Sequence, residues 1–184
     1  MSSGHSSDRS GTPAGDPSGP RRSVRLRVPT DGDAAAWHRV FDHPEVMEFH
    51  GGTAQDLAYY EELTAGQRAH AERLGYCLYS LLDDGGRVMG FTGAQPWPHA
   101  WGPSGEIEIG WRLGRDFWGR GYATLAAEAT LERLRAAGVT RVVAMVDARN
   151  ERSLAVTRRL GMAPAETYVS PVSGATGICH RLEL

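Results

Sequence analysis

Two glutamates stand one residue apart in the apolar stretch Glu106-Ile107-Glu108-Ile109-Gly110-Trp111. Alternation of this kind predicts a strand with both carboxylates on one face and the isoleucines on the other. A carboxylate beside a bound amine can take its proton, directly or through water, and so act as a general base. Glu108 and Glu106 are therefore candidate catalytic residues. Solvated edge charges or fold-stabilising ion pairs are the alternative interpretation of both.

A glycine-rich turn, Gly119-Arg120-Gly121, follows this strand and precedes an alanine-rich run. That run predicts a helix over 121–137. The first-turn N–H groups of such a helix have no partner within the helix, and the helix dipole favours negative charge there. Because glycine has no Cβ, a phosphate can approach the backbone closely. The order strand, turn, helix predicts a pyrophosphate site, although a tight turn without a ligand would read the same way.

A second helix is predicted over 151–160, ending at Gly161. Asn150 stands at its N-cap position and Ser153 lies in its first turn. Both side chains have a purely local interpretation as caps, which is compatible with a ligand contact for Asn150.

The elements that must position these residues follow from the periodicity of the chain. Residues 1–22 are rich in Ser, Gly and Pro and predict a disordered tail, and 23–184 predict one domain. The expected strands are 23–28, 76–82, 87–94, 106–113, 139–146, 165–171 and 177–184. The expected helices are 33–41 capped by Thr30 or Asp31, 45–47 after Pro44, 54–73 capped by Thr53, 121–137 and 151–160. This pattern predicts a single α/β domain with a mixed sheet and helices on both faces.

Composition excludes several function classes. The net charge of −2 gives no electrostatic reason to expect nucleic acid as a partner. Cys77 and Cys179 are far apart and lack the spacing of a metal site or a disulfide framework, and no histidine pair has the spacing of a helical metal site. No transmembrane run or signal peptide is evident. We expect a soluble cytoplasmic protein with no metal and no membrane partner.

Four segments in the same order resemble the GNAT superfamily of N-acetyltransferases. Trp118-Gly119-Arg120-Gly121-Tyr122-Ala123-Thr124 is similar to its acyl-CoA pyrophosphate loop, and 147–153 with 160–162 to its late strand–helix segment. The runs 24–27 and 42–47, with Glu108-Ile109-Gly110-Trp111, resemble the RimJ/RimL-like branch of ribosomal-protein N-terminal acetyltransferases. The resemblance covers about 23–184. It implies a mostly antiparallel mixed sheet, flanked by helices, whose splayed central strand pair binds acyl-CoA.

The resemblance implies an acyl-CoA-dependent N-acyltransferase that moves acetyl from acetyl-CoA to a primary amine by direct attack in a ternary complex. The acceptor would be a protein N-terminus or a small molecule such as an amino acid, polyamine or aminoglycoside. Homodimers are common in the family. The implied cofactor-binding residues are Trp111, Leu113, Trp118, Gly119, Arg120, Gly121, Tyr122, Ala123, Thr124, Asn150 and Ser153.

The same resemblance ranks the catalytic candidates. It favours Glu108 as base, because this residue belongs to the Glu-Ile-Gly unit, with Glu106 second. A thiolate leaving group with a pKa of about 8.5 needs only weak acid assistance, so Ser153 or a water would suffice. A backbone N–H around Leu113 would stabilise the oxyanion.

Two departures keep alternatives open. Trp118 stands where many members have Gln or Arg, a substitution familiar in the RimJ/RimL-like branch. Thr157 stands where many have the tyrosine acid, so a non-catalytic acyl-CoA-binding module is the alternative to an enzyme. Succinyl-CoA is an alternative donor. Trp97 and Trp101 could line an acceptor pocket or merely pack. A nucleotide-binding α/β protein ranks third, because the turn lacks a third helix glycine and a suitably spaced ribose-binding acid.

Overall fold

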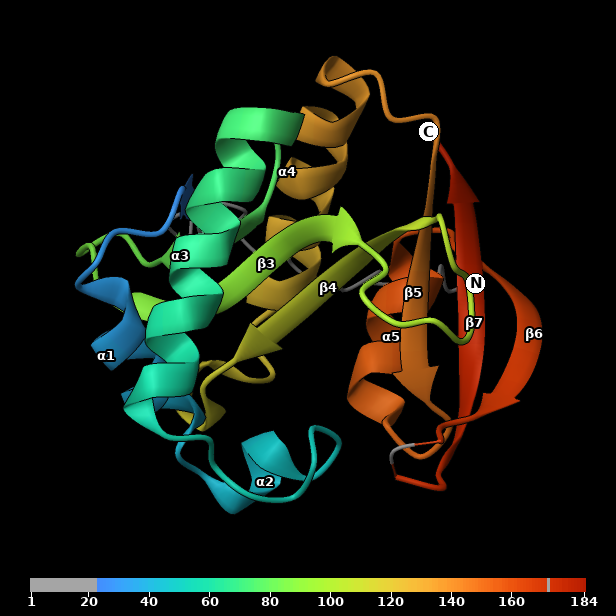
Figure 1. Ribbon diagram of the computed structural model, residues 1–184, viewed down its shortest axis with the longest axis horizontal. Helices are drawn as coiled ribbons and strands as arrows, with labels where there is room; N and C mark the ends of the chain where they lie inside the picture. The colour runs from blue at the N-terminus through green and yellow to red at the C-terminus, as the bar shows by residue number, and fades with distance from the viewer. Residues whose placement is uncertain (1–22, 172) are drawn as a thin grey trace, which may run out of the picture.

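The computed structural model describes residues 23–171 and 173–184, which form one seven-stranded sheet with helices on both faces (Figure 1). The strand order is β1-β2-β3-β4-β5-β7-β6. The strands are β1 (Arg25–Arg27), β2 (Leu78–Leu82), β3 (Val88–Pro96), β4 (Ile107–Leu113), β5 (Arg141–Asp147), β6 (Ala163–Val169) and β7 (Thr176–Glu183). The helices are α1 (Asp33–Phe41), α2 (Pro44–Met47), α3 (Leu57–Leu74), α4 (Tyr122–Ala136) and α5 (Glu151–Arg159), with a 3-10 turn η1 (Arg115–Phe117). The predicted mixed α/β sheet is confirmed, whereas the predicted tail, 1–22, lies outside the described residues.

The sheet opens into a wedge between β4 and β5. These two strands are parallel and share a single register pair, Glu108 with Val143, while every other neighbouring pair is antiparallel. β3 stays in register with β4 along its whole length, and β7 does the same for β5. Figure 1 shows β4 and β5 diverging toward their carboxyl ends, with α2 near the open end. The expected splayed strand pair is thus present.

Each face of the sheet buries its own apolar cluster. On the face covered by α1 and α3, Phe91 of β3 packs against Trp37 and Phe41, with ring centroids 5.1 and 5.5 Å apart. On the opposite face, Ile109 of β4 packs with Leu131 and other residues of α4. Successive side chains of a strand alternate between the faces. Odd-numbered residues of β4 therefore point to α4, and even-numbered residues point to α1 and α3.

Two predicted helix caps are wrong. Helix α1 has Gly32 at its N-cap without a side-chain cap. The carboxylate of Asp33 is buried and accepts hydrogen bonds from the Thr30 N–H and the Ser80 hydroxyl, so a tertiary contact takes the place of the cap. Helix α3 is capped by Asp56, which accepts from the Tyr59 N–H at 2.9 Å, rather than by Thr53.

Candidate active site

A cavity of about 630 Å³ lies at the open end of the wedge. Its walls come from the end of β4, from the turn before α4, from α5, and from α2 with the residues after it. The lining residues are Glu45, Val46, Phe49, His50, Trp111, Arg112, Leu113, Phe117, Trp118, Gly119, Gly121, Tyr122, Ala123, Thr124, Asn150, Glu151, Arg152, Ser153, Ala155, Val156 and Arg159. Every predicted cofactor-binding residue except Arg120 is among them. Residues remote in sequence therefore meet at one site.

The turn before α4 offers backbone donors to this cavity. Gly119 and Gly121 have φ of 70° and 78°, a conformation that favours glycine. Gly121 supplies no side-chain cap, and the first backbone bond of the helix runs from the Leu125 N–H to the Gly121 carbonyl at 3.1 Å. The amides of 122–124 thus precede the helical hydrogen-bond ladder. A Cβ added at either glycine would meet no atom within 4 Å, so the approach for a phosphate is open.

A backbone N–H of β4 also points into the wedge. Hydrogen bonds from the Trp97 N–H to the Glu106 carbonyl and from the Gly114 N–H to the Met89 carbonyl, both 2.9 Å, direct the backbone of even-numbered residues toward β3. Backbone direction alternates along an antiparallel pair. The N–H of Leu113 therefore faces the side from which β5 has diverged, where it can donate to an oxygen that gains negative charge.

Trp118 closes one wall of the cavity. Its Nε1–H donates to the Leu113 carbonyl at 2.8 Å, and the guanidinium carbons of Arg152 and Arg115 lie 4.4 and 5.3 Å from its ring centroid. The tryptophan thus joins the end of β4 to the phosphate-binding turn. This fixed position explains how the site can carry Trp118 where the family often has Gln or Arg.

The first turn of α5 faces the same cavity. The Asn150 side chain accepts from the Ser153 N–H at 3.1 Å, which confirms the predicted cap. The Ser153 hydroxyl accepts from Trp111 Nε1 at 3.3 Å, so its own hydrogen can be donated elsewhere. Thr157 is fully buried and donates to the Leu154 carbonyl at 2.9 Å, which directs its hydroxyl into its own helix.

Glu108 lies on the other face of β4, at the register pair from which the wedge opens. Its cross-strand partner on β3 is Gln95, which accepts a hydrogen bond from Gln67 of α3 at 2.9 Å. Desolvation raises the pKa of Glu108 to about 7, and the nearby Arg112 opposes this shift. Near neutral pH this carboxyl can therefore both take and release a proton.

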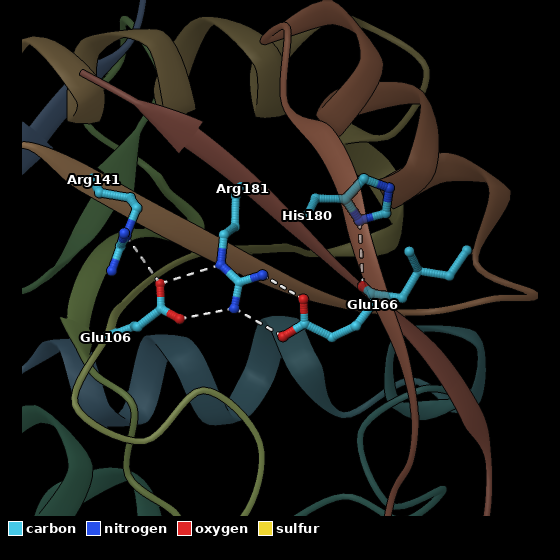
Figure 2. Close-up of polar contacts among 6 residues, drawn as sticks. Glu106, Arg141, Glu166, His180 and Arg181 are labelled. Atoms are coloured by element: carbon cyan, nitrogen blue, oxygen red, sulfur yellow. Dashed lines mark hydrogen bonds and ion pairs between the residues drawn. The ribbon is translucent and has the colours of Figure 1, made fainter.

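Glu106 has a different environment. Figure 2 shows its carboxylate between two arginines: Arg181 lies 2.8 Å away and Arg141 3.2 Å away. Arg181 also pairs with Glu166 of β6. This network ties the start of β4 to β5, β7 and β6 at the closed end of the wedge. Glu106 does not line the cavity, which favours the ion-pair interpretation over a base.

Replacing Glu106 by glutamine should lower the free energy of unfolding by about 1–3 kcal/mol, because two arginines lose their shared counter-charge. The midpoint of chemical denaturation measures this change. Turnover should fall less than about threefold, since removal of a general base costs far more. The matched control Glu166→Gln removes the more exposed carboxylate of the network and should destabilise less. A collapse of turnover with unchanged stability would restore Glu106 as a base.

Several lining residues were not predicted from the sequence. Arg152 and Arg159 lie seven positions apart on α5 and so share one helix face, a spacing that could have marked a basic stripe for phosphates. Arg112 shares a strand face with Glu108, which alternation alone could have revealed. Phe49 and His50 follow α2 without any local signal. They reach the cavity only through the fold.

A model of the acetyltransferase (GNAT) domain family matches residues 23–163. This chain belongs to the GNAT acetyltransferase family. A GnaT-family acetyltransferase from Bordetella pertussis has the same fold, with a TM-score of 0.75 and 22% identity over 88% of this chain and 95% of that one. An acetyltransferase from Salmonella typhimurium, solved with acetyl-CoA, gives 0.69 and 18% over 88% and 94%.

Sequence comparison agrees with this assignment. An uncharacterized protein, YkkB, from Bacillus subtilis is 29% identical over 147 residues, which is 78% of this GNAT protein and 84% of YkkB. The predicted superfamily, the enzyme class and the use of acetyl-CoA are thereby confirmed, whereas the RimJ/RimL-like branch stays a prediction. Within residues 23–171 and 173–184, no group of three or more His, Cys, Asp or Glu could hold a metal ion. None of the helices described is long and apolar enough to cross a membrane.

Proposed function

We propose that this acetyltransferase moves the acetyl group of acetyl-CoA to a primary amine by direct attack in a ternary complex, with Glu108 as general base. The observation that carries the proposal is the position of Glu108. It stands where the wedge opens, on the face opposite the turn that offers donors to a phosphate. The donor would be held by the amides of 122–124, by Trp118 and by the start of α5. It supplies an activated thioester.

The residues of the chain then have separate tasks. Glu108 takes the proton of the attacking amine, because an ammonium group cannot act as a nucleophile. The Leu113 N–H donates into the wedge, where it can stabilise negative charge on a carbonyl oxygen. Ser153 holds a hydroxyl hydrogen that can go to the departing thiolate, which needs only a weak acid. Trp111 orients this hydroxyl through the 3.3 Å hydrogen bond.

The pH dependence should report Glu108. Because the base works only when deprotonated, kcat/KM should rise with pH through about 7, the raised pKa of this carboxyl. The acceptor amine adds a second inflection at higher pH, about 8 for an α-amine. Initial rates from pH 5.5 to 9.5 measure both. A wild-type profile with only the amine inflection would remove Glu108 from the mechanism.

The proposed function is tested by thiol release from acetyl-CoA with a panel of amines that includes peptides with varied N-termini, amino acids, polyamines and aminoglycosides. Release stimulated by one class would identify the acceptor. Binding of CoA without release would direct the search to another donor such as succinyl-CoA, and then to a sensor role. The homodimer and the cytoplasmic location stay predictions.

A further inference from the structure

Arg112 places a positive charge in the wall of the cavity on the Glu108 side of the sheet. Its guanidinium carbon lies 5.3 Å from the ring centroids of both Phe41 and Phe91. Its Nε is buried, and no hydrogen-bond partner for it exists among the described residues. A buried guanidinium without a partner is costly, because its hydration is lost and nothing replaces it.

No carboxylate of the described residues lies within ion-pair distance of Arg112. Glu45, which also lines the cavity, is held by Arg115 with both carboxylate oxygens 3.1 Å from its Nε. Glu108 shares the strand face four residues earlier, a Cα spacing of about 13 Å, and forms no ion pair with Arg112. The cavity thus offers an uncompensated cation and, further along the same face, the proposed base.

We infer that Arg112 binds the carboxylate of the acceptor, so that the acceptor is a free amino acid whose amine turns toward Glu108. This inference rests on the proposed function and names its substrate class. A guanidinium pairs with a carboxylate through two parallel hydrogen bonds. One cation matches a monoanion, whereas polyamines and aminoglycosides would meet like charge. A peptide N-terminus lacks the carboxylate at this distance from the amine.

Matched substrates test the inference. Each L-amino acid is compared with its carboxamide, which keeps the amine and side chain and removes only the charge. The amide has the more acidic ammonium group and is the better nucleophile near neutral pH, so chemistry alone favours it. The wild-type enzyme should nevertheless show at least a tenfold higher kcat/KM for the acid. Equal or faster turnover of the amide would overturn the inference.

Variants separate recognition from folding. Arg112→Gln should lower kcat/KM for the amino acid about 30-fold or more, mainly through KM, and should change turnover of the amide and the KM of acetyl-CoA less than threefold. Arg112→Lys keeps the charge and should recover part of the loss. Arg39→Gln removes an exposed arginine of α1 that does not line the cavity and should behave as wild type. Equal losses with acid and amide would indicate a structural role for Arg112 and contradict carboxylate binding.

The two proposals can fail separately. Turnover of uncharged or cationic amines without preference for acids would leave the acetyltransferase function in place and overturn only the role of Arg112. Should no amine be turned over, the proposed function would fail, and calorimetry with the CoA-bound protein would decide the rest. Amino acid binding that is lost in Arg112→Gln but retained in Arg39→Gln would still support the carboxylate site. Binding unaffected by Arg112→Gln would end it.

Discussion

Replacing Glu108 by glutamine should lower kcat about 10²- to 10⁴-fold, the usual cost of removing a general base. The amide keeps the shape of the side chain and removes the proton acceptor. The KM of acetyl-CoA should change little, because the residues that line the donor side of the cavity are untouched. Steady-state thiol release with the best acceptor measures both constants.

The same variant should gain stability as pH rises. Burial raises the pKa of Glu108 above its ordinary value to about 7, so the folded state holds this proton more tightly than the unfolded chain. The contribution of Glu108 is therefore fully present at low pH and is lost as pH rises through about 7. Glutamine has no charge to bury. Thermal unfolding of Glu108→Gln at pH 8 should thus show a Tm above wild type, and near pH 4 the difference should vanish. A lower Tm at pH 8 together with lost activity would point to misfolding rather than to a missing base.

Replacing Gly93 by alanine should destabilise the fold by about 4 kcal/mol or more, the range of severe core changes. A Cβ at this position of β3 would lie 2.0 Å from the Cys77 carbonyl oxygen and 2.6 Å from the Leu78 Cα, both backbone atoms of the neighbouring chain segment. The φ of 154° adds strain for any residue with a side chain. Since β3 holds β4 in register, the wedge should be lost with the strand. Circular dichroism during urea titration measures the change.

Gly110 supplies the matched control. It pairs with Gly93 across β3 and β4, but a Cβ added there meets no atom within 4 Å. Gly110→Ala should therefore stay within about 1 kcal/mol of wild type, or gain slightly through a less flexible unfolded chain. Equal destabilisation by the two alanines would show that loss of glycine, and not the clash with the Cys77 carbonyl, decides stability.

Local signals predicted the donor side of the site well. Gly119 and Gly121 have the positive φ that the turn requires, and Asn150 caps α5 as its sequence position suggests. The hydrogen bonds and dihedral angles concerned lie within three or four residues of each other. Such features depend on short-range sterics and donor–acceptor geometry, which a sequence displays directly.

Local signals failed where a side chain has a distant partner. Thr53 and Asp56 are both acceptable caps, and only Asp56 is used. Asp33 looked like the first residue of a helix, yet its carboxylate joins Arg27 and Ser80. Leu57 has the spacing of a core residue and is 40% exposed. In each case, packing against another element decides between options that are equivalent along the chain.

The two glutamates illustrate the boundary most clearly. By itself, the sequence determined the family, the phosphate-binding turn and a strand carrying Glu106 and Glu108 on one face. Only the tertiary structure surrounded Glu106 with Arg141 and Arg181 and left Glu108 desolvated with a raised pKa. The reason is electrostatic. The state of a carboxylate depends on charges and solvent within several ångströms, and the sheet brings those charges from residues 35 and more positions away.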